Sequence, residues 1–237
     1  MTILLMASLI PPLFLLWKVY QSDTIEKEPT RLLIGIFVLG MISTIPAGIL
    51  EMMGSAILAA ALGVQPGVSS SGMRIFNLFF YFIVVGGAEE LVKFLAMRIP
   101  TWRNRAFNYV FDGVVYGVTA ALGFAALENV LYVLDTGLST AGIRAWTAIP
   151  LHCIAGIFMG HYYGIAKAAE RWGDRKVKNR MLRRSILIPM LIHGAYDFIA
   201  SDESPLLVFV FFAYIIVLDV LAYRSLKSYS QHDVNLE

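Results

Sequence analysis

The sequence is poor in cysteine and in charge. Its single cysteine, Cys153, excludes an internal disulfide and cannot by itself form a cysteine-ligated metal site. We therefore expect Cys153 to be a small apolar residue packed within a helix. Only 15% of the 237 residues are charged, whereas soluble domains carry about a quarter. With 58% hydrophobic residues, this composition indicates an integral membrane protein.

Several common signatures are also missing. The sequence has no HExxH motif, which excludes a conventional zincin. It has no internal repeat of useful length and no stretch typical of a separate soluble domain. No basic segment precedes the first apolar run and no clear cleavage site follows it, so we expect a retained helix rather than a signal peptide. We expect one transmembrane helical domain, residues 1–226, followed by a polar cytoplasmic tail, residues 227–237.

Long apolar runs predict an all-α, polytopic membrane bundle. Residues 52–64 are apolar but too short for an ordinary crossing, so they either extend the preceding helix past Glu51 or form a re-entrant or interfacial piece. Residues 63–72, rich in Gly, Ser and Pro, predict a loop. The expected spans number seven, or eight if residues 52–64 cross: 3–20, 32–50, 75–97, 107–134, 141–168, 185–200 and 205–223.

Basic residues concentrate in alternate links between these spans. The richest link, residues 171–184, carries seven Lys or Arg side chains, and we expect it to be a solvated loop facing lipid headgroups. The positive-inside rule then predicts an external N-terminus and a cytoplasmic C-terminus. The same rule accounts for the basic residues, so we expect membrane lipid as a partner and no nucleic acid.

The most informative stretch is residues 86–94, Gly-Gly-Ala-Glu-Glu-Leu-Val-Lys-Phe, inside an apolar span. Ionisable groups at membrane depth are costly and usually carry function. Lys93 lies four residues after Glu89 and three after Glu90, so on a helix its ammonium can reach either carboxylate. The two glutamates point about 100° apart. One of them can therefore face a reacting centre while the other pairs with Lys93; the alternative is an ion pair that only fixes packing.

Other spans carry further polar residues. Glu128 and Asn129 lie in the fourth span, His152 in the fifth, and His193 and Asp197, four residues apart, in the sixth. A lone membrane histidine is more often an interhelical hydrogen-bond partner than a ligand. Carboxylates and histidines on separate helices together offer the groups of a general-base or metal site. Zn²⁺ binds histidine nitrogen and carboxylate oxygen and keeps a position for water, whose proton a glutamate can take.

These residues, in this order, resemble the PrsW family of intramembrane proteases, which is related to the type II CAAX prenyl proteases. The resemblance runs over nearly the whole chain. It implies an endopeptidase that cleaves a single-pass membrane protein, such as an anti-sigma factor at the first cut of regulated proteolysis. The matching residues are Glu89-Glu90-x-x-Lys93, Phe124-x-x-x-Glu128-Asn129, His152 and His193-x-x-x-Asp197, with Lys27-Glu28-Pro29, Ile45-Pro46-Ala47 and Glu51 in support.

The resemblance also implies roles for individual residues. Glu89 and Glu90 would be the essential acid pair, and we expect Glu90 to be the general base, with Glu89 next in order. His152 and His193 would activate water or bind one Zn²⁺ together with a carboxylate. Asp197 would orient His193, and Lys93, Glu128 and Asn129 would support the site.

Two departures separate the chain from the prenyl proteases. Glu128 stands where those relatives have a histidine, and no arginine follows Lys93 directly. These differences argue against a prenylated substrate and leave metal dependence open. Helix rise places Glu89 about 20 Å and Glu128 about 10 Å from the outer helix ends, which makes Glu128 the weakest candidate ligand.

Two other functional classes could use the same polar groups. A proton-coupled transporter uses buried acids and histidines as a relay, but the inverted repeats typical of transporters are not visible here. A catalytically silent scaffold could use them to bind a partner helix.

Overall fold

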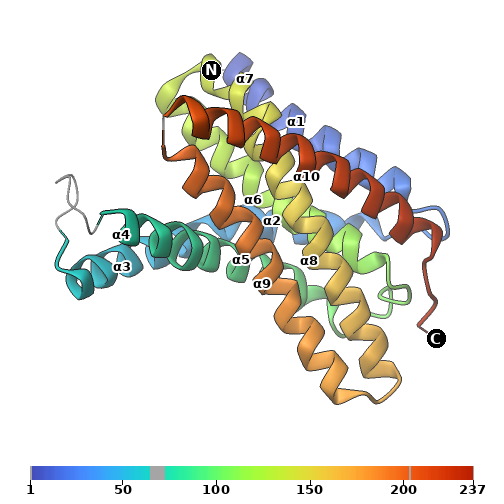
Figure 1. Cartoon of the computed structure of the whole chain (residues 1–237). Coiled ribbons are helices and arrows are strands. Elements are labelled where there is room, and N and C mark those ends of the chain that lie inside the picture. Colours follow the sequence, from blue (N-terminus) through green and yellow to red (C-terminus); the bar gives the residue numbers. More distant parts are fainter. Residues whose placement is uncertain (1, 65–72, 203, 237) are drawn as a thin grey trace.

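The computed structural model describes residues 2–64, 73–202 and 204–236, and within these ranges the fold consists of helices and their connections. Figure 1 shows α3 and α4 extending away from the bundle that the other helices form. The helices are α1 Thr2–Ser22, α2 Thr30–Ile42, α3 Thr44–Leu62, α4 Met73–Phe79, a π-helical segment Phe80–Val85, α5 Gly86–Thr101, α6 Asp112–Thr136, α7 Leu138–Trp146, α8 Ala148–Arg171, α9 Arg175–Ala200 and α10 Pro205–Gln231.

Six helical stretches within the described ranges are long and apolar enough to cross a membrane. They are Thr2–Ser22, Thr30–Leu62, Met73–Thr101, Asp112–Thr136, Leu138–Arg171 and Pro205–Gln231. The remaining long helix, α9, begins with the basic run and becomes apolar only in its second half. The predicted all-α, multi-pass membrane fold is confirmed.

The centre of the bundle is the pair α6 and α8, which approach closely along glycines. A methyl group on Gly160 would lie 2.1 Å from the carbonyl oxygen of Gly113, and one on Gly117 would lie 2.5 Å from that of Gly156. A methyl group cannot lie this close to another atom. Only glycine at these positions therefore allows the two backbones to touch. This contact holds His152, on α8, next to the helices that carry the acids.

The helical stretch that contains the expected second span, residues 32–50, continues to Leu62. Residues 52–62 belong to α3, so they extend the helix past Glu51 rather than forming a separate piece. The helix is interrupted earlier, at Ser43, between α2 and α3. Pro46 lies in the first turn of α3, where its missing N–H costs little. Helix α3 ends at Leu62, and Gly63 follows it with a φ of 62°. Of the predicted 63–72 loop, residues 65–72 lie outside the described ranges.

The predicted fourth and fifth spans differ from the structure in how they begin and divide. The expected 107–134 helix begins only at Asp112, whose Oδ2 accepts the backbone N–H groups of Asn108 and Tyr109 and so fixes a turn before the helix. The expected 141–168 helix is two helices, α7 and α8, separated at Thr147, which has a φ of −125° and a ψ of −76°.

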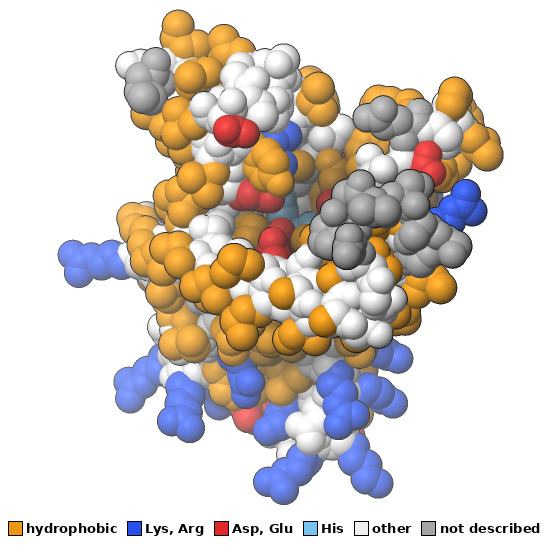
Figure 2. All heavy atoms as spheres, turned by 90° about the vertical axis from the view of Figure 1, so that its left-hand side faces the viewer, with side chains coloured by type: hydrophobic (Ala, Val, Ile, Leu, Met, Phe, Trp, Pro, Cys, Tyr) orange, Lys and Arg blue, Asp and Glu red, His pale blue; other side chains and the backbone are white. Residues whose placement is uncertain are grey.

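The basic run predicted to be a loop is mostly helix. After α8, Gly173 turns the chain with a φ of 77°, and Asp174 caps α9 by accepting the backbone N–H of Val177. Residues 175–184 form the first turns of α9. The basic side chains still gather at one end of the molecule, as Figure 2 shows.

The end of the chain packs against a connection in the middle of the sequence. Helix α10 continues to Gln231, further than the predicted span. Beyond it, Val234 accepts a hydrogen bond from the backbone N–H of Val110, and Leu236 donates one to Asn108. The side chain of Leu236 is buried. The predicted polar tail is therefore part helix and part docked segment.

Candidate active site

A π-helical segment precedes the residues that carry the charges. Residues 80–85 turn more widely than an α-helix, a feature often found at functional sites. Directly after it, a methyl group on Gly86 would lie 3.0 Å from the carbonyl oxygen of Met190, and one on Gly194 would lie 2.6 Å from the Cα of Phe82. These small residues let the beginning of α5 lie against α9, next to His193.

Lys93 is the centre of the buried cluster. Its Nζ donates to Glu89 Oε2 and to Glu90 Oε1, both at 2.8 Å, so the spacing predicted these two contacts correctly. The ammonium also lies 2.9 Å from Nδ1 of His152. The side chains of Lys93 and Glu90 are completely buried, and those of Glu89 and His152 are nearly so.

The two ring nitrogens of His152 have different partners. An ammonium can only donate, so Nδ1 accepts from Lys93 and the ring proton lies on Nε2. That nitrogen donates to Oε2 of Glu128, at 3.0 Å. The ring of His152 is therefore held from both sides, by α5 and by α6.

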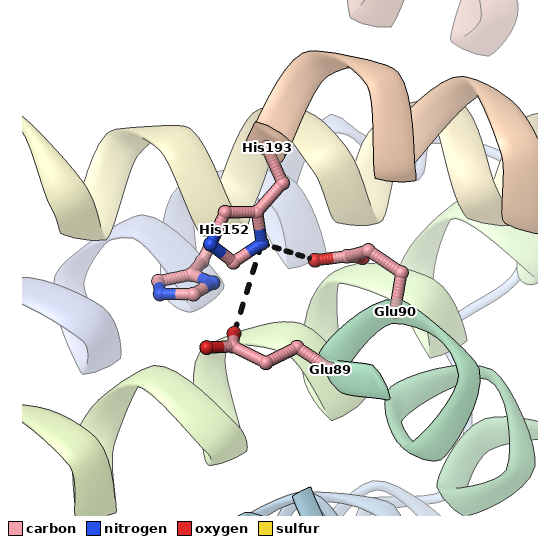
Figure 3. Close-up of side chains that lie close together, drawn as sticks. All are labelled: Glu89, Glu90, His152 and His193. Atoms are coloured by element: carbon pink, nitrogen blue, oxygen red, sulfur yellow. Dashed lines mark hydrogen bonds and ion pairs between the residues drawn. The ribbon is translucent and has the colours of Figure 1, made fainter. Parts of the chain in front are cut away.

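His193 approaches the same acids from α9. Its Nδ1 lies 2.8 Å from Glu90 Oε1 and 3.7 Å from Glu89 Oε2, contacts drawn in Figure 3. Its Nε2 lies 3.3 Å from Oδ2 of Asp197, the residue one turn later that the sequence placed on the same face. The rings of His152 and His193 meet edge to face, with centroids 5.2 Å apart.

A cavity of about 260 Å³ opens beside this cluster. Figure 2 looks into a hollow of the surface with acidic and histidine side chains at its floor, on the side away from the basic end. Glu89 lies in the cavity wall, whereas Glu90 does not. The cavity geometry thus favours Glu89 over Glu90 as the acid that meets a substrate, although the expected role of Glu90 stays untested. Further wall residues include Glu51, Glu128, His152, His193 and Asp197.

Glu128 lies closer to the site than its position along the helix suggested. It reaches His152 and lines the cavity. It is nevertheless outside the group whose possible ligand atoms all lie within 4.8 Å of one another: Glu89, Glu90, His152 and His193. Glu128 therefore contacts a histidine of the site without being one of the four clustered ligands.

Comparison with known proteins identifies the family. A family described as PrsW family intramembrane metalloprotease matches residues 28–222. The chain belongs to the PrsW family. Protease PrsW of Bacillus subtilis is 30% identical over 198 residues, which cover 84% of this chain and 83% of the relative. The PrsW proteases of Halalkalibacterium halodurans and Clostridioides difficile are also 30% identical, over 97% of this chain and 98% and 92% of their own lengths. No solved structure matches.

Membership of the PrsW family makes the chain an intramembrane protease, and so a hydrolase, with several membrane-spanning helices. The family predicted from the motifs is confirmed. Membership of the PrsW family favours the protease interpretation over the transporter and scaffold alternatives. The relation to the CAAX prenyl proteases stays a prediction.

The four clustered residues suit a metal ion by their chemistry. Two carboxylates and two imidazoles are ligands that Zn²⁺ accepts, and the family is described as metalloproteases. Oε2 of Glu90 is buried without a hydrogen-bond partner in the described structure, so one ligand atom is available. Lys93 already bonds three of the four residues. An ion held by Nδ1 of His152 would have to displace the ammonium, because that nitrogen has a single lone pair.

Sequence reasoning missed the part that Arg144 plays in this PrsW site. None of the sequence motifs assigns a role to this arginine, but it lines the cavity from α7. Its Nη2 lies 2.6 Å from Glu128 Oε2, and its Nε donates to Oδ1 of Asn129 at 2.9 Å. A lone charge in the otherwise uncharged stretch 138–146 was the available signal.

Proposed function

We propose that the chain is an endopeptidase in which Glu89 activates a water molecule for attack on a peptide bond of a single-pass membrane protein. One observation carries this proposal: Glu89, His152 and His193 share the wall of one cavity within an apolar bundle. A carboxylate in such a cavity can remove a proton from water and return it to the leaving amine.

The neighbouring residues have complementary roles in this proposal. Lys93 and Glu90 hold Glu89 and His193 in place, because their charges pair inside the protein. Asp197 supports His193 from the other ring nitrogen. The two imidazoles line the cavity wall beside Glu89, so they form part of the fixed polar surroundings of the oxyanion that develops during attack, a contribution that grows where water is scarce.

A Zn²⁺ ion would fit this proposal if held by His152, His193 and Glu89 or Glu90. When bound, such an ion lowers the pKa of its water and polarises the peptide carbonyl. Glu128 is excluded from this ligand set because it lies outside the four-residue cluster. Its role in the proposal is to hold His152 through Nε2.

Membership of the PrsW family supports a membrane protein as the substrate. We propose a single-pass membrane protein, with an anti-sigma factor as the first candidate, cut at the beginning of regulated proteolysis. The test uses purified protein in lipid nanodiscs with such a substrate, with and without a chelator, and measures metal content per mole. Cleavage by the wild type that is lost in Glu89→Gln supports the proposal, and equal cleavage by both contradicts it. Full activity without stoichiometric metal would leave the protease proposal standing and end the zinc proposal.

The orientation of the chain is proposed from its charges. We place the basic end, residues 171–184, and the end of α10 in the cytoplasm, with the N-terminus outside. The cavity then opens on the half of the molecule away from the cytoplasm, because it lies opposite the basic end in Figure 2. Cysteines introduced into the 171–184 segment of a Cys153-free variant test this orientation; labelling by an impermeant reagent in intact cells would contradict it.

A further inference from the structure

Helix α7 connects α6 to α8 and is mostly peripheral. Three of its apolar side chains are strongly exposed: Leu138, Ile143 and Trp146, the last at 80%. Arg144 is its only charged residue. In contrast to its apolar neighbours, the arginine side chain is only 14% exposed and turns inward to the cavity.

Arg144 contacts two consecutive residues of α6. Its Nη2 bonds Oε2 of Glu128, and its Nε donates to Oδ1 of Asn129. Asn129 is completely buried and donates in turn to the carbonyl oxygen of Ser8 on α1. The guanidinium also lies 4.3 Å from the ring centroid of Tyr132. With these partners on several sides, the guanidinium has one fixed position.

The oxygen that Arg144 contacts is the one that holds His152. Oε2 of Glu128 accepts from both Arg144 and the Nε2–H of His152. The opposite ring nitrogen accepts from Lys93, which bonds Glu89 in the cavity wall. A continuous chain of hydrogen bonds therefore runs from α7 through Glu128 and His152 to the acid that we assign to the reaction.

We propose that Arg144 is a positioning residue of the protease: it fixes the carboxylate of Glu128, which fixes the ring orientation of His152. This inference rests on the proposed function, in which His152 takes part in the reaction. Without the guanidinium, Glu128 can rotate toward other donors and the ring of His152 loses its partner at Nε2. Residues that act on the site through one intervening side chain typically change activity about 10- to 100-fold when they are substituted.

The test compares kinetics of Arg144→Met with Arg74→Met, an exposed arginine of α4 away from the site. We expect Arg144→Met to lower kcat roughly 10- to 100-fold with KM nearly unchanged, and Arg74→Met to change neither. Arg144→Lys should recover part of kcat, because an ammonium can pair with Glu128 but lacks the rigid fork that places Nη2 on Glu128 and Nε on Asn129. A raised KM with normal kcat would instead show that Arg144 contacts substrate, and would overturn the proposal.

Two further measurements separate positioning from a general effect on folding. The double variant Glu128→Gln/Arg144→Met should be no slower than Glu128→Gln alone, because the arginine acts through that carboxylate; additive losses would overturn the proposal. Nitrogen NMR of labelled histidine should show His152 protonated on Nε2 in the wild type. In Arg144→Met the proton should stay on Nε2, because Lys93 still donates to Nδ1, but the Nε2 signal should shift and broaden, because its acceptor is no longer fixed. An unchanged spectrum would overturn it as well.

The same series keeps the two proposals apart. If His152→Ala cleaves at the normal rate, the proposed function is wrong about His152, whatever Arg144 does. If His152→Ala is inactive while Arg144→Met matches Arg74→Met, only the positioning role of Arg144 is wrong.

Discussion

The protein buries two groups of acids, and they differ in what surrounds them. The active-site cluster has its acids bonded to an ammonium and to histidine, and one of them, Glu89, faces a cavity. The second group, here termed the link cluster, lies where the 23–29 and 102–111 connections meet the end of the chain. The link cluster consists of the buried residues Asp23, Glu28, Asp112 and Tyr116, together with Asp233, which is half-buried.

The link cluster is held mainly by neutral donors. Glu28 accepts from the hydroxyl of Tyr116, Asp112 from two backbone N–H groups, and Asp233 from that of Phe111. Within the described ranges no ion pair joins these carboxylates to Lys, Arg or His. Burial of acids alone therefore does not mark an active site. In this protein the active-site cluster is distinguished by the basic groups paired with its acids and by the cavity beside it. The comparison predicts that changes in the first cluster affect the rate and changes in the second affect stability.

The largest expected effect separates the two glutamates of the active-site cluster. Glu89→Gln should lower the rate of cleavage by roughly 10²- to 10⁴-fold, because an amide keeps the shape but cannot take a proton from water. Glu90→Gln, the matched variant, should lose less activity, because Glu90 does not reach the cavity. Both rates are measured with the purified protein and a single-pass substrate. The reverse order of the two losses would return the general base to Glu90.

A second prediction concerns the charge at the centre of the same cluster. Lys93→Met leaves two buried carboxylates without their ammonium, so we expect it to destabilise the protein by about 3–5 kcal/mol and to abolish cleavage. Unfolding in detergent can be followed by the reactivity of the buried thiol of Cys153.

The double variant Glu90→Gln/Lys93→Met sharpens this prediction. It removes one carboxylate together with the ammonium, so stability should largely return while activity does not. If the single Lys93→Met variant were as stable as the wild type, the ammonium would not be compensating the buried acids.

The sequence predicted the local part of the active-site cluster well. Helical spacing alone brought Glu89, Glu90 and Lys93 together, and it also placed Asp197 next to His193. Contacts between residues three or four apart depend only on helix geometry. The presence of acids and histidines on separate spans was also visible, because polar residues are rare in such apolar segments.

Features that depend on distant contacts could not be predicted in this way. The π-helical turn before Gly86 lies against α9, about a hundred residues later in the chain, and no pattern within residues 80–85 indicates it. The break at Thr147 turned one expected span into two helices and directed Arg144 to the cavity. The expected depth of Glu128 rests on helix rise alone, which treats the helices as parallel and their outer ends as level with one another. In the structure Glu128 meets His152 directly.

The smallest expected effect belongs to the link cluster and appears as a dependence of stability on pH. Burial raises the pKa of Glu28 from its ordinary value of 4.5 to about 7, although the hydrogen bond from Tyr116 opposes the shift. Between these two pH values the folded protein holds a proton that the unfolded chain has released. Stability therefore falls as the pH rises from about 4.5 to about 7 and changes no further above that range. The shift corresponds to about 3 kcal/mol.

Glu28→Gln tests this assignment, because the amide keeps the hydrogen-bonding shape but does not titrate. We expect the variant to lose this fall in stability between pH 4.5 and 7, as followed by the reactivity of Cys153 during thermal unfolding, and to become more stable than the wild type at pH 7 and above. Its rate of cleavage should match that of the wild type at a pH where both are folded, since Glu28 is not in the wall of the active-site cavity. A normal pH dependence of stability together with a large loss of cleavage would give the opposite result: the link cluster would then act in the reaction, and the distinction between the two groups of acids would fail.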